Sequence, residues 1–149
     1  MIITICSSVD FTPKIIEIKN ELEKKGHRVN IPYVTQKIIN GEISFEEYMN
    51  SKEKSGDIIV RNALSVDMLK RYWDYIKNSD AILVLNLKKK SIDNYIGGNV
   101  LMEMGFAYGQ GKKIFLFNPI PERSERIHYV DEIIDLRPII INGDLNRIE

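Results

Sequence analysis

The sequence predicts one α/β domain built on a five-stranded parallel sheet that helices cover on both faces. Two observations indicate this class. Short apolar runs rich in β-branched residues alternate with longer amphipathic stretches. The chain has 149 residues, of which 44% are hydrophobic and 28% charged, which suits a single buried core. Because strand–helix–strand units cross over right-handedly, we expect a doubly wound, Rossmann-like (flavodoxin-like) sheet of order 2-1-3-4-5 in one domain, residues 1–149.

Five segments have the length and composition of buried strands. The first, Ile2–Cys6, is a continuous apolar run, as expected for a strand covered on both faces. The second, residues 28–33, contains Pro32. The other three are residues 81–86, 113–118 and 138–141.

The stretches between the strands carry helix signals. Residues 12–26 begin with Thr12 as the expected N-cap, followed by Pro13, and end at Gly26. Residues 44–54 open with a capping-box pattern. Three more helices are expected at 62–80, at 98–111 and, as a short segment, within 119–134. The apolar stripe expected on the first of these three is Leu64, Met68, Tyr72 and Ile76.

The composition argues against several classes of function. Lys plus Arg and Asp plus Glu both number 21, and this zero net charge does not indicate a nucleic-acid partner. Cys6 is the single cysteine and His27 and His128 are isolated, so no metal site is indicated. The apolar start is too short for a signal peptide or a membrane span. We therefore expect a cytoplasmic protein with no cofactor, metal, membrane or nucleic-acid partner.

Parallel sheets of this kind bind ligands outside the carboxyl ends of their strands, where strands 1 and 3 diverge. Ser7 and Ser8 follow strand 1, and they either bind a phosphate or sugar hydroxyl or cap the next turn. Asn86 and Asn118 end strands 3 and 4. Each either forms hydrogen bonds with the edge of a base or ribose or simply terminates its strand. Cys6, at the end of strand 1, is expected to be a small apolar filler.

Glu103 is the only charged residue between Asn94 and Gly111. The helix that carries it starts at the ligand edge, and Gly97, Gly98 and Asn99 at that start allow close approach of a ligand. The apolar face expected on this helix is Val100, Leu101, Met104, Ala107 and Tyr108. A carboxylate among such residues is partly desolvated, which favours a nucleophile or an acid/base; the alternative is a solvent-facing Glu that helps the helix start.

Residues 79–117, "SDAILVLN…GGNVLMEMGFAYGQGKKIFLF", resemble the nucleoside 2-deoxyribosyltransferases and the related 2′-deoxynucleoside 5′-phosphate N-hydrolases. The resemblance implies that Glu103 is the nucleophile on C1′ of a deoxyribose, forming a glycosyl-enzyme. It also implies a nucleoside or nucleotide substrate and a homodimer or larger homo-oligomer.

The chain departs from the family pattern at several places. The family's Gly-x-Gly before the nucleophile falls at residues 99–101, and some transferases have an Asp where Gly97 stands. The family's Asp on the helix before strand 3 falls at Tyr72, with Asp67 and Asp74 nearby on other faces. Its aromatic residue on strand 1 falls at Thr4, and the basic residue that helps the hydrolases hold a 5′-phosphate falls at Asp10.

Three functions therefore remain open. The first is cleavage or transfer at the N-glycosidic bond of a nucleoside or nucleotide with Glu103 as nucleophile. The second is a non-catalytic module that senses a nucleotide or nucleotide-sugar in the same crevice. The third is a phosphoribohydrolase-like enzyme, although the fuller "PGGxGTxxE" of that class is absent.

Overall fold

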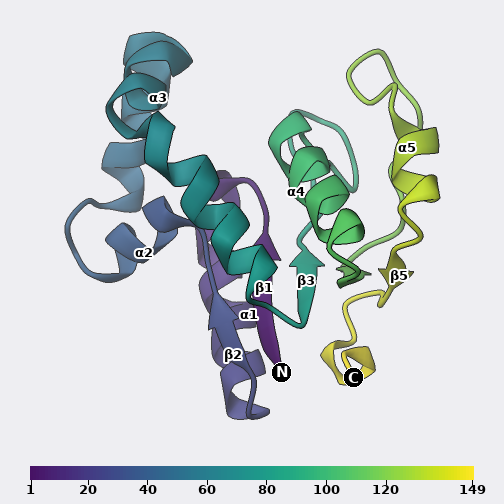
Figure 1. Ribbon diagram of the computed structural model, residues 1–149. Helices are drawn as coiled ribbons and strands as arrows, with labels where there is room; N and C mark the ends of the chain where they lie inside the picture. Colours follow the sequence, from purple (N-terminus) through teal and green to yellow (C-terminus); the bar gives the residue numbers. More distant parts are fainter.

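The computed structural model describes the backbone of residues 1–149 and every side chain outside residues 53–67. Its core is a five-stranded parallel sheet of order β2-β1-β3-β4-β5, which confirms the predicted fold class and strand order (Figure 1). The strands are β1 (Ile2–Cys6), β2 (Arg28–Asn30), β3 (Ala81–Val84), β4 (Lys113–Leu116) and β5 (Ile139–Ile140).

Several strands are shorter than their apolar runs suggested. The second strand ends at Asn30 rather than at residue 33, because Pro32 lacks the N–H that a sheet ladder needs. Pro32 instead becomes the N-cap of helix α2 (Tyr33–Ile39), which the sequence reading had missed. The third strand ends at Val84, which pairs with Cys6 of β1, and not at residue 86 as the apolar run suggested.

The principal helices are α1 (Thr12–Lys24), α3 (Phe45–Lys77), α4 (Gly98–Gly109) and α5 (Val130–Asp135). Short 3₁₀ turns, η1 (Val9–Phe11) and η2 (Leu145–Arg147), precede α1 and close the chain. Thr12 is the first helical residue rather than the N-cap, since its hydroxyl donates back to the Val9 carbonyl at 2.6 Å and Phe11 occupies the cap. None of the described helices is long and apolar enough to cross a membrane.

The two helices expected at 44–54 and 62–80 are one helix, α3. Its predicted start is confirmed: the Glu47 amide donates to Ser44 Oγ at 3.0 Å, and the Ser44 amide donates to the Glu47 carboxylate at 2.8 Å. Tyr72 and Ile76 of the expected stripe are buried, and Met68 is half-buried. The side chain of Leu64 lies outside the described residues.

Alternate residues of each strand enter two hydrophobic layers. Leu83 faces a layer that includes Ile15, Ile18 and Leu22 of α1, whereas its neighbours Ile82 and Val84 face a second layer. The second layer is made by α3, α4 and α5, which lie together on the side of the sheet opposite α1 (Figure 1). Glu103 and Cys6 belong to this second side.

Candidate active site

Helix α4 begins at the carboxyl edge of the sheet, after the loop that follows β3. Gly97 is its N-cap and supplies no capping side chain. A Cβ at Gly97 would lie 3.3 Å from the Tyr95 ring, so glycine allows Tyr95 to pack against the helix start. Gly98 and Asn99 in the first turn are exposed, and a first turn leaves backbone N–H groups that the helix itself cannot pair. The helix start is therefore exposed to solvent, and its role in binding a ligand stays a prediction.

The inner face of α4 consists of Val100, Met104 and Ala107, all buried. Leu101 packs at the edge of this face, whereas Tyr108, which the sequence placed in the same stripe, is 49% exposed. Tyr108 is the residue before the last of the helix, and no other element covers it.

The Glu103 carboxyl group lies at the junction of α3, α4 and the end of β1. One neighbour is the thiol of Cys6, which donates to the Thr4 carbonyl at 4.0 Å and is close enough to affect the pKa of the carboxyl group. Tyr72 of α3 also interacts electrostatically with Glu103. Cys6 is fully buried, and Tyr72 is buried with its hydroxyl donating to the Ile5 carbonyl. Glu103 is half-buried as a residue, and its Oε2 atom is inaccessible to solvent, so its carboxyl group is turned away from water.

Burial raises the pKa of Glu103 from 4.5 to about 8, while the hydrogen bond from Cys6 acts in the opposite direction. The Cys6 thiol itself has a raised pKa, first because it is buried and second because Glu103 is close. Burial also raises the pKa of Tyr72, so both neighbours stay protonated at neutral pH. The carboxyl group of Glu103 is thus flanked by two neutral side chains whose protons are directed to backbone carbonyls, Cys6 to Thr4 and Tyr72 to Ile5.

Two polar atoms near this junction have no hydrogen-bond partner among the described residues: Glu103 Oε2 and Trp73 Nε1. Trp73 of α3 stacks on Phe106 of α4 with ring centroids 4.6 Å apart, and Phe106 lies one turn beyond Glu103. Buried polar atoms are paired in most proteins, and the exceptions concentrate at functional sites. An unpaired acceptor and an unpaired donor across the α3–α4 contact are groups that a bound ligand can satisfy.

The positions that differ from the family pattern have structural roles here. The Thr4 hydroxyl is buried and bonds Ser79 Oγ at 2.6 Å, with Asn30 Nδ2 3.0 Å away. Asp74 is exposed, and the side chain of Asp67 lies outside the described residues. Tyr72 contributes a phenol where the family has a carboxylate. Glu103 therefore has no second carboxyl partner that the described residues reveal.

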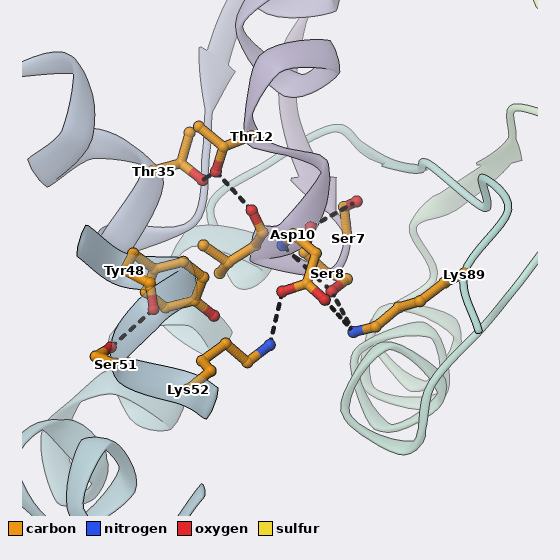
Figure 2. A network of polar contacts seen from close by, with 10 residues as sticks. Ser7, Ser8, Asp10, Thr12, Thr35, Tyr48, Ser51, Lys52 and Lys89 are labelled. Atoms are coloured by element: carbon orange, nitrogen blue, oxygen red, sulfur yellow. Dashed lines mark hydrogen bonds and ion pairs between the residues drawn. The ribbon is translucent and has the colours of Figure 1, made fainter. Parts of the chain in front are cut away.

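A second polar cluster surrounds η1 at the same edge of the sheet (Figure 2). Lys52 of α3 donates to Asp10 at 2.6 Å, and Lys89, from the loop after β3, lies 2.8 Å from the other Asp10 oxygen. Lys89 also donates to Ser8 Oγ at 2.8 Å. Ser8 is the N-cap of η1, accepting from the Asp10 amide, while Ser7 Oγ donates to the Leu85 carbonyl at 3.3 Å.

Asn86 and Asn118 bond each other across the ends of β3 and β4. The Asn118 amide donates to Asn86 Oδ1 at 2.8 Å, and Asn118 Nδ2 donates to the Asn86 carbonyl at 3.0 Å. Asn86 Nδ2 donates to the Asn118 and Pro119 carbonyls. Asn86 is fully buried, so its amide holds two loops together. Its role in reading a substrate remains a prediction, since a ligand would have to compete with these bonds.

The residues singled out in the sequence thus fall into separate groups. Glu103 joins Cys6 and Tyr72, Ser8 joins Lys89, and Asn86 joins Asn118. The sequence reading missed Cys6 and Tyr72 as neighbours of Glu103, because nothing in their spacing indicates a contact between β1, α3 and α4. It also missed that Lys52 and Lys89 both form ion pairs with Asp10, although the lysine run 88–90 lay in the predicted ligand loop.

The described residues form a hollow beside β2 but no cluster suited to a metal ion. The described residues contain no group of three or more His, Cys, Asp or Glu side chains suited to a metal ion. A hollow of about 100 Å³ beside β2 is lined by uncharged residues. Its lining is Val29, Asn30, Ile31, Tyr33, Gln36 and Tyr75. The junction at Glu103 is the better candidate because it combines a raised pKa with unpaired polar atoms.

Replacing Cys6 by Ala is expected to raise the pKa of Glu103 further, because the thiol hydrogen bond favours the ionised carboxylate. The measurement is a titration of the Glu103 side-chain carbonyl signal by ¹³C NMR. Cys6→Ser keeps a donor and is expected to leave the pKa close to that of the parent. An unchanged or lower pKa in Cys6→Ala would contradict the contact.

No protein-family model and no curated protein matches the sequence. Among solved structures, a 2-deoxyribosyltransferase from Bacillus psychrosaccharolyticus is 20% identical with a TM-score of 0.46, covering 84% of this chain and 77% of the other. A 2-desoxiribosyltransferase from Leishmania mexicana is 17% identical with a TM-score of 0.46, covering 85% and 75%. A CMP N-glycosidase from Clostridium botulinum is 16% identical with a TM-score of 0.45, covering 95% and 90%. These are the proteins that the chain is similar to in structure. The functional argument below rests on the residues themselves.

Proposed function

We propose that this protein is an enzyme that cleaves or transfers the N-glycosidic bond of a nucleoside or nucleotide, with Glu103 as the nucleophile. One observation carries the proposal: burial raises the pKa of the Glu103 carboxyl group to about 8, and its Oε2 has no hydrogen-bond partner among the described residues. Carboxyl groups in such surroundings are typical of catalytic sites. The resemblance of residues 79–117 to deoxyribosyl-transferring and N-hydrolysing enzymes supports the choice of bond.

The proposed reaction has two steps. A Glu103 carboxylate oxygen attacks C1′ of the sugar, the C1′–N bond breaks, and its electron pair leaves with the base, which takes a proton from solvent. Water then attacks C1′ to give the free sugar and restores the carboxylate, or a second base attacks to give a new nucleoside. A low-dielectric site strengthens the attraction between the carboxylate and the positive charge that develops on the sugar.

Glu103 must lose its proton before it can attack. With a pKa of about 8 the group is mostly protonated at neutral pH in the free protein, so kcat/KM is expected to rise with pH and level off above about pH 8. A general acid at the same position would give the opposite profile, with kcat/KM falling through the same range. The pH dependence of base release therefore distinguishes the two roles of one carboxyl group.

A non-catalytic nucleotide-binding module is the second candidate. Two observations favour it. Tyr72, a phenol with a raised pKa, stands where the family has an acid, and the Oε2 atom of Glu103 is buried. Such a module would bind a nucleotide without releasing its base. Ligand binding seen as a thermal shift, with no turnover of any ligand that binds, is the result expected for this alternative.

The two candidates are separated by incubating the purified protein with a panel of nucleosides and their 5′-monophosphates. Chromatography then detects the free base and the free sugar, and a second base added to each reaction reveals transfer. The proposal predicts base release that depends on protein concentration for at least one substrate. Saturable binding across the panel with no release of base would contradict it.

A further inference from the structure

The contact between α3 and α4 contains two buried polar atoms that complement each other. Trp73 Nε1 is a donor whose proton does not dissociate, and Glu103 Oε2 is an acceptor. Each atom is closed to solvent and has no hydrogen-bond partner among the described residues. A buried donor or acceptor is costly to leave unpaired. A single hydrogen bond between the two atoms would remove both costs.

The indole ring of Trp73 has a defined place at this contact. It stacks on the Phe106 ring of α4, with 4.6 Å between the ring centroids and 14° between the ring planes. Phe106 is three residues beyond Glu103, and side chains at this spacing are neighbours on a helix surface. Tyr72, the residue before Trp73, already interacts with Glu103. The stack therefore holds the indole beside the turn of α4 that carries the carboxyl group.

The other donors near Glu103 are already engaged. The Cys6 thiol and the Tyr72 hydroxyl both donate to backbone carbonyls of β1. Among these described neighbours, Trp73 is the donor without an acceptor. Because both unpaired atoms are closed to solvent, water cannot reach either one unless the α3–α4 contact opens. Rotation about the side-chain bonds of Glu103 can bring its carboxyl group to the indole while the stack stays in place.

We propose that Trp73 is a positioning residue for Glu103: its indole N–H donates to one oxygen of the ionised carboxylate and holds it while the other oxygen attacks the sugar. The attack rests on the proposed function, whereas the hydrogen bond is a property of the free protein. A hydrogen bond to a carboxylate is roughly twice as strong as one to a neutral acceptor. The bond therefore forms as Glu103 loses its proton, and it opposes the rise in pKa that burial causes.

Two other described titratable groups act on Glu103, and neither one replaces the indole. Cys6 of β1 and Tyr72 of α3 both have raised pKa values, so they stay neutral in the range where Glu103 ionises. The indole itself does not ionise in this range. A change at the Trp73 N–H between about pH 6 and pH 9 therefore reports on the Glu103 carboxyl group.

The first test follows the indole N–H directly. Trp73 is the single tryptophan of the chain, so protein labelled with ¹⁵N-tryptophan gives one indole peak in an NMR spectrum. We expect this peak to move downfield as the pH rises, with the same midpoint as the Glu103 carboxyl signal. Glu103→Gln is expected to abolish the movement, and Glu21→Gln, at an exposed position of α1, is expected to keep it. A peak that stays fixed, or that titrates equally in Glu103→Gln, would overturn the inference.

The second test removes the N–H and keeps the bicyclic ring. Because the chain has one tryptophan, biosynthetic incorporation of β-(3-benzothienyl)alanine changes residue 73 alone and places sulfur where the indole has N–H. The stack on Phe106 is retained, which thermal unfolding checks, and the pKa of Glu103 is expected to rise. Trp73→Phe, which also lacks the donor, is expected to shift the pKa in the same direction.

Tyr108→Phe is the matched control, because it removes an O–H donor from an exposed position of the same helix as Glu103. It is expected to leave the pKa of Glu103 unchanged. An unchanged pKa in the benzothienyl protein, or an equal rise in Tyr108→Phe, would overturn the inference. Both tests use the free protein, so they are independent of turnover. An indole bond without base release would contradict the proposed function alone, and base release without the bond would contradict this inference alone.

Discussion

Glu103→Gln is expected to lower kcat/KM for base release at least about 10³-fold, as loss of a covalent nucleophile does in other enzymes. Glutamine has nearly the same shape as glutamate and can still form hydrogen bonds. Its neutral amide, however, cannot form the glycosyl ester or stabilise the positive charge that develops on the sugar. Because the side-chain volume is kept, substrate binding should change far less than turnover. The measurement is steady-state base release, with substrate affinity followed separately by titration.

The matched control is Glu21→Gln, which makes the same chemical change at an exposed position of α1. It is expected to keep kcat/KM within about two-fold of the parent. Equal turnover in Glu103→Gln and the parent would exclude Glu103 as the nucleophile. A large loss of substrate affinity with unchanged kcat would instead assign Glu103 to binding.

Glu103→Gln is also expected to stabilise the folded protein, and by more as the pH rises. In the unfolded chain the carboxyl group ionises near pH 4.5, but in the folded protein it ionises only near pH 8. Between these values the folded state holds a proton that the unfolded state has released, so parent stability falls as pH rises through this window. The full shift corresponds to a loss on the order of 5 kcal/mol, complete above about pH 8.

Glutamine cannot ionise, so the stability of the Glu103→Gln variant does not fall in this way as the pH rises. At pH 5 the two proteins should unfold at similar temperatures, because protonated glutamate and glutamine both stay neutral. Above about pH 8 the variant should unfold about 10 °C higher than the parent. Thermal unfolding of parent, Glu103→Gln and Glu21→Gln over this range measures the difference. A gap that does not widen with pH would show that the Glu103 pKa is not raised.

The sheet was largely predictable because its signals are local. Continuous apolar runs such as Ile2–Cys6 identify buried strands, and right-handed crossovers then leave few possible orders. Helix boundaries were less predictable. The run from Phe45 to Lys77 has a clear start at Ser44, but no proline or glycine pair marks a break, so the choice between one helix and two depended on tertiary packing.

The candidate site was predictable at one residue and not at its neighbours. Glu103 stands out because its surroundings in the sequence are uncharged. Cys6 and Tyr72 reach it from segments that are 97 and 31 positions away, and no alternation of polar and apolar residues encodes such a meeting. Asn86 and Asn118 were correctly placed at strand ends, but their pairing with each other depends on the register of β3 and β4.

The claim that Glu103 is a covalent nucleophile is tested most directly by mass spectrometry of protein incubated with a 2′-fluoro nucleoside. The electron-withdrawing fluorine destabilises positive charge on the sugar and slows hydrolysis of the glycosyl-enzyme, so the intermediate accumulates. We predict an increase in protein mass equal to one sugar without its base, located by peptide mapping on Glu103. Base release with no added mass, or with the sugar on another residue such as Cys6, would contradict the proposed mechanism.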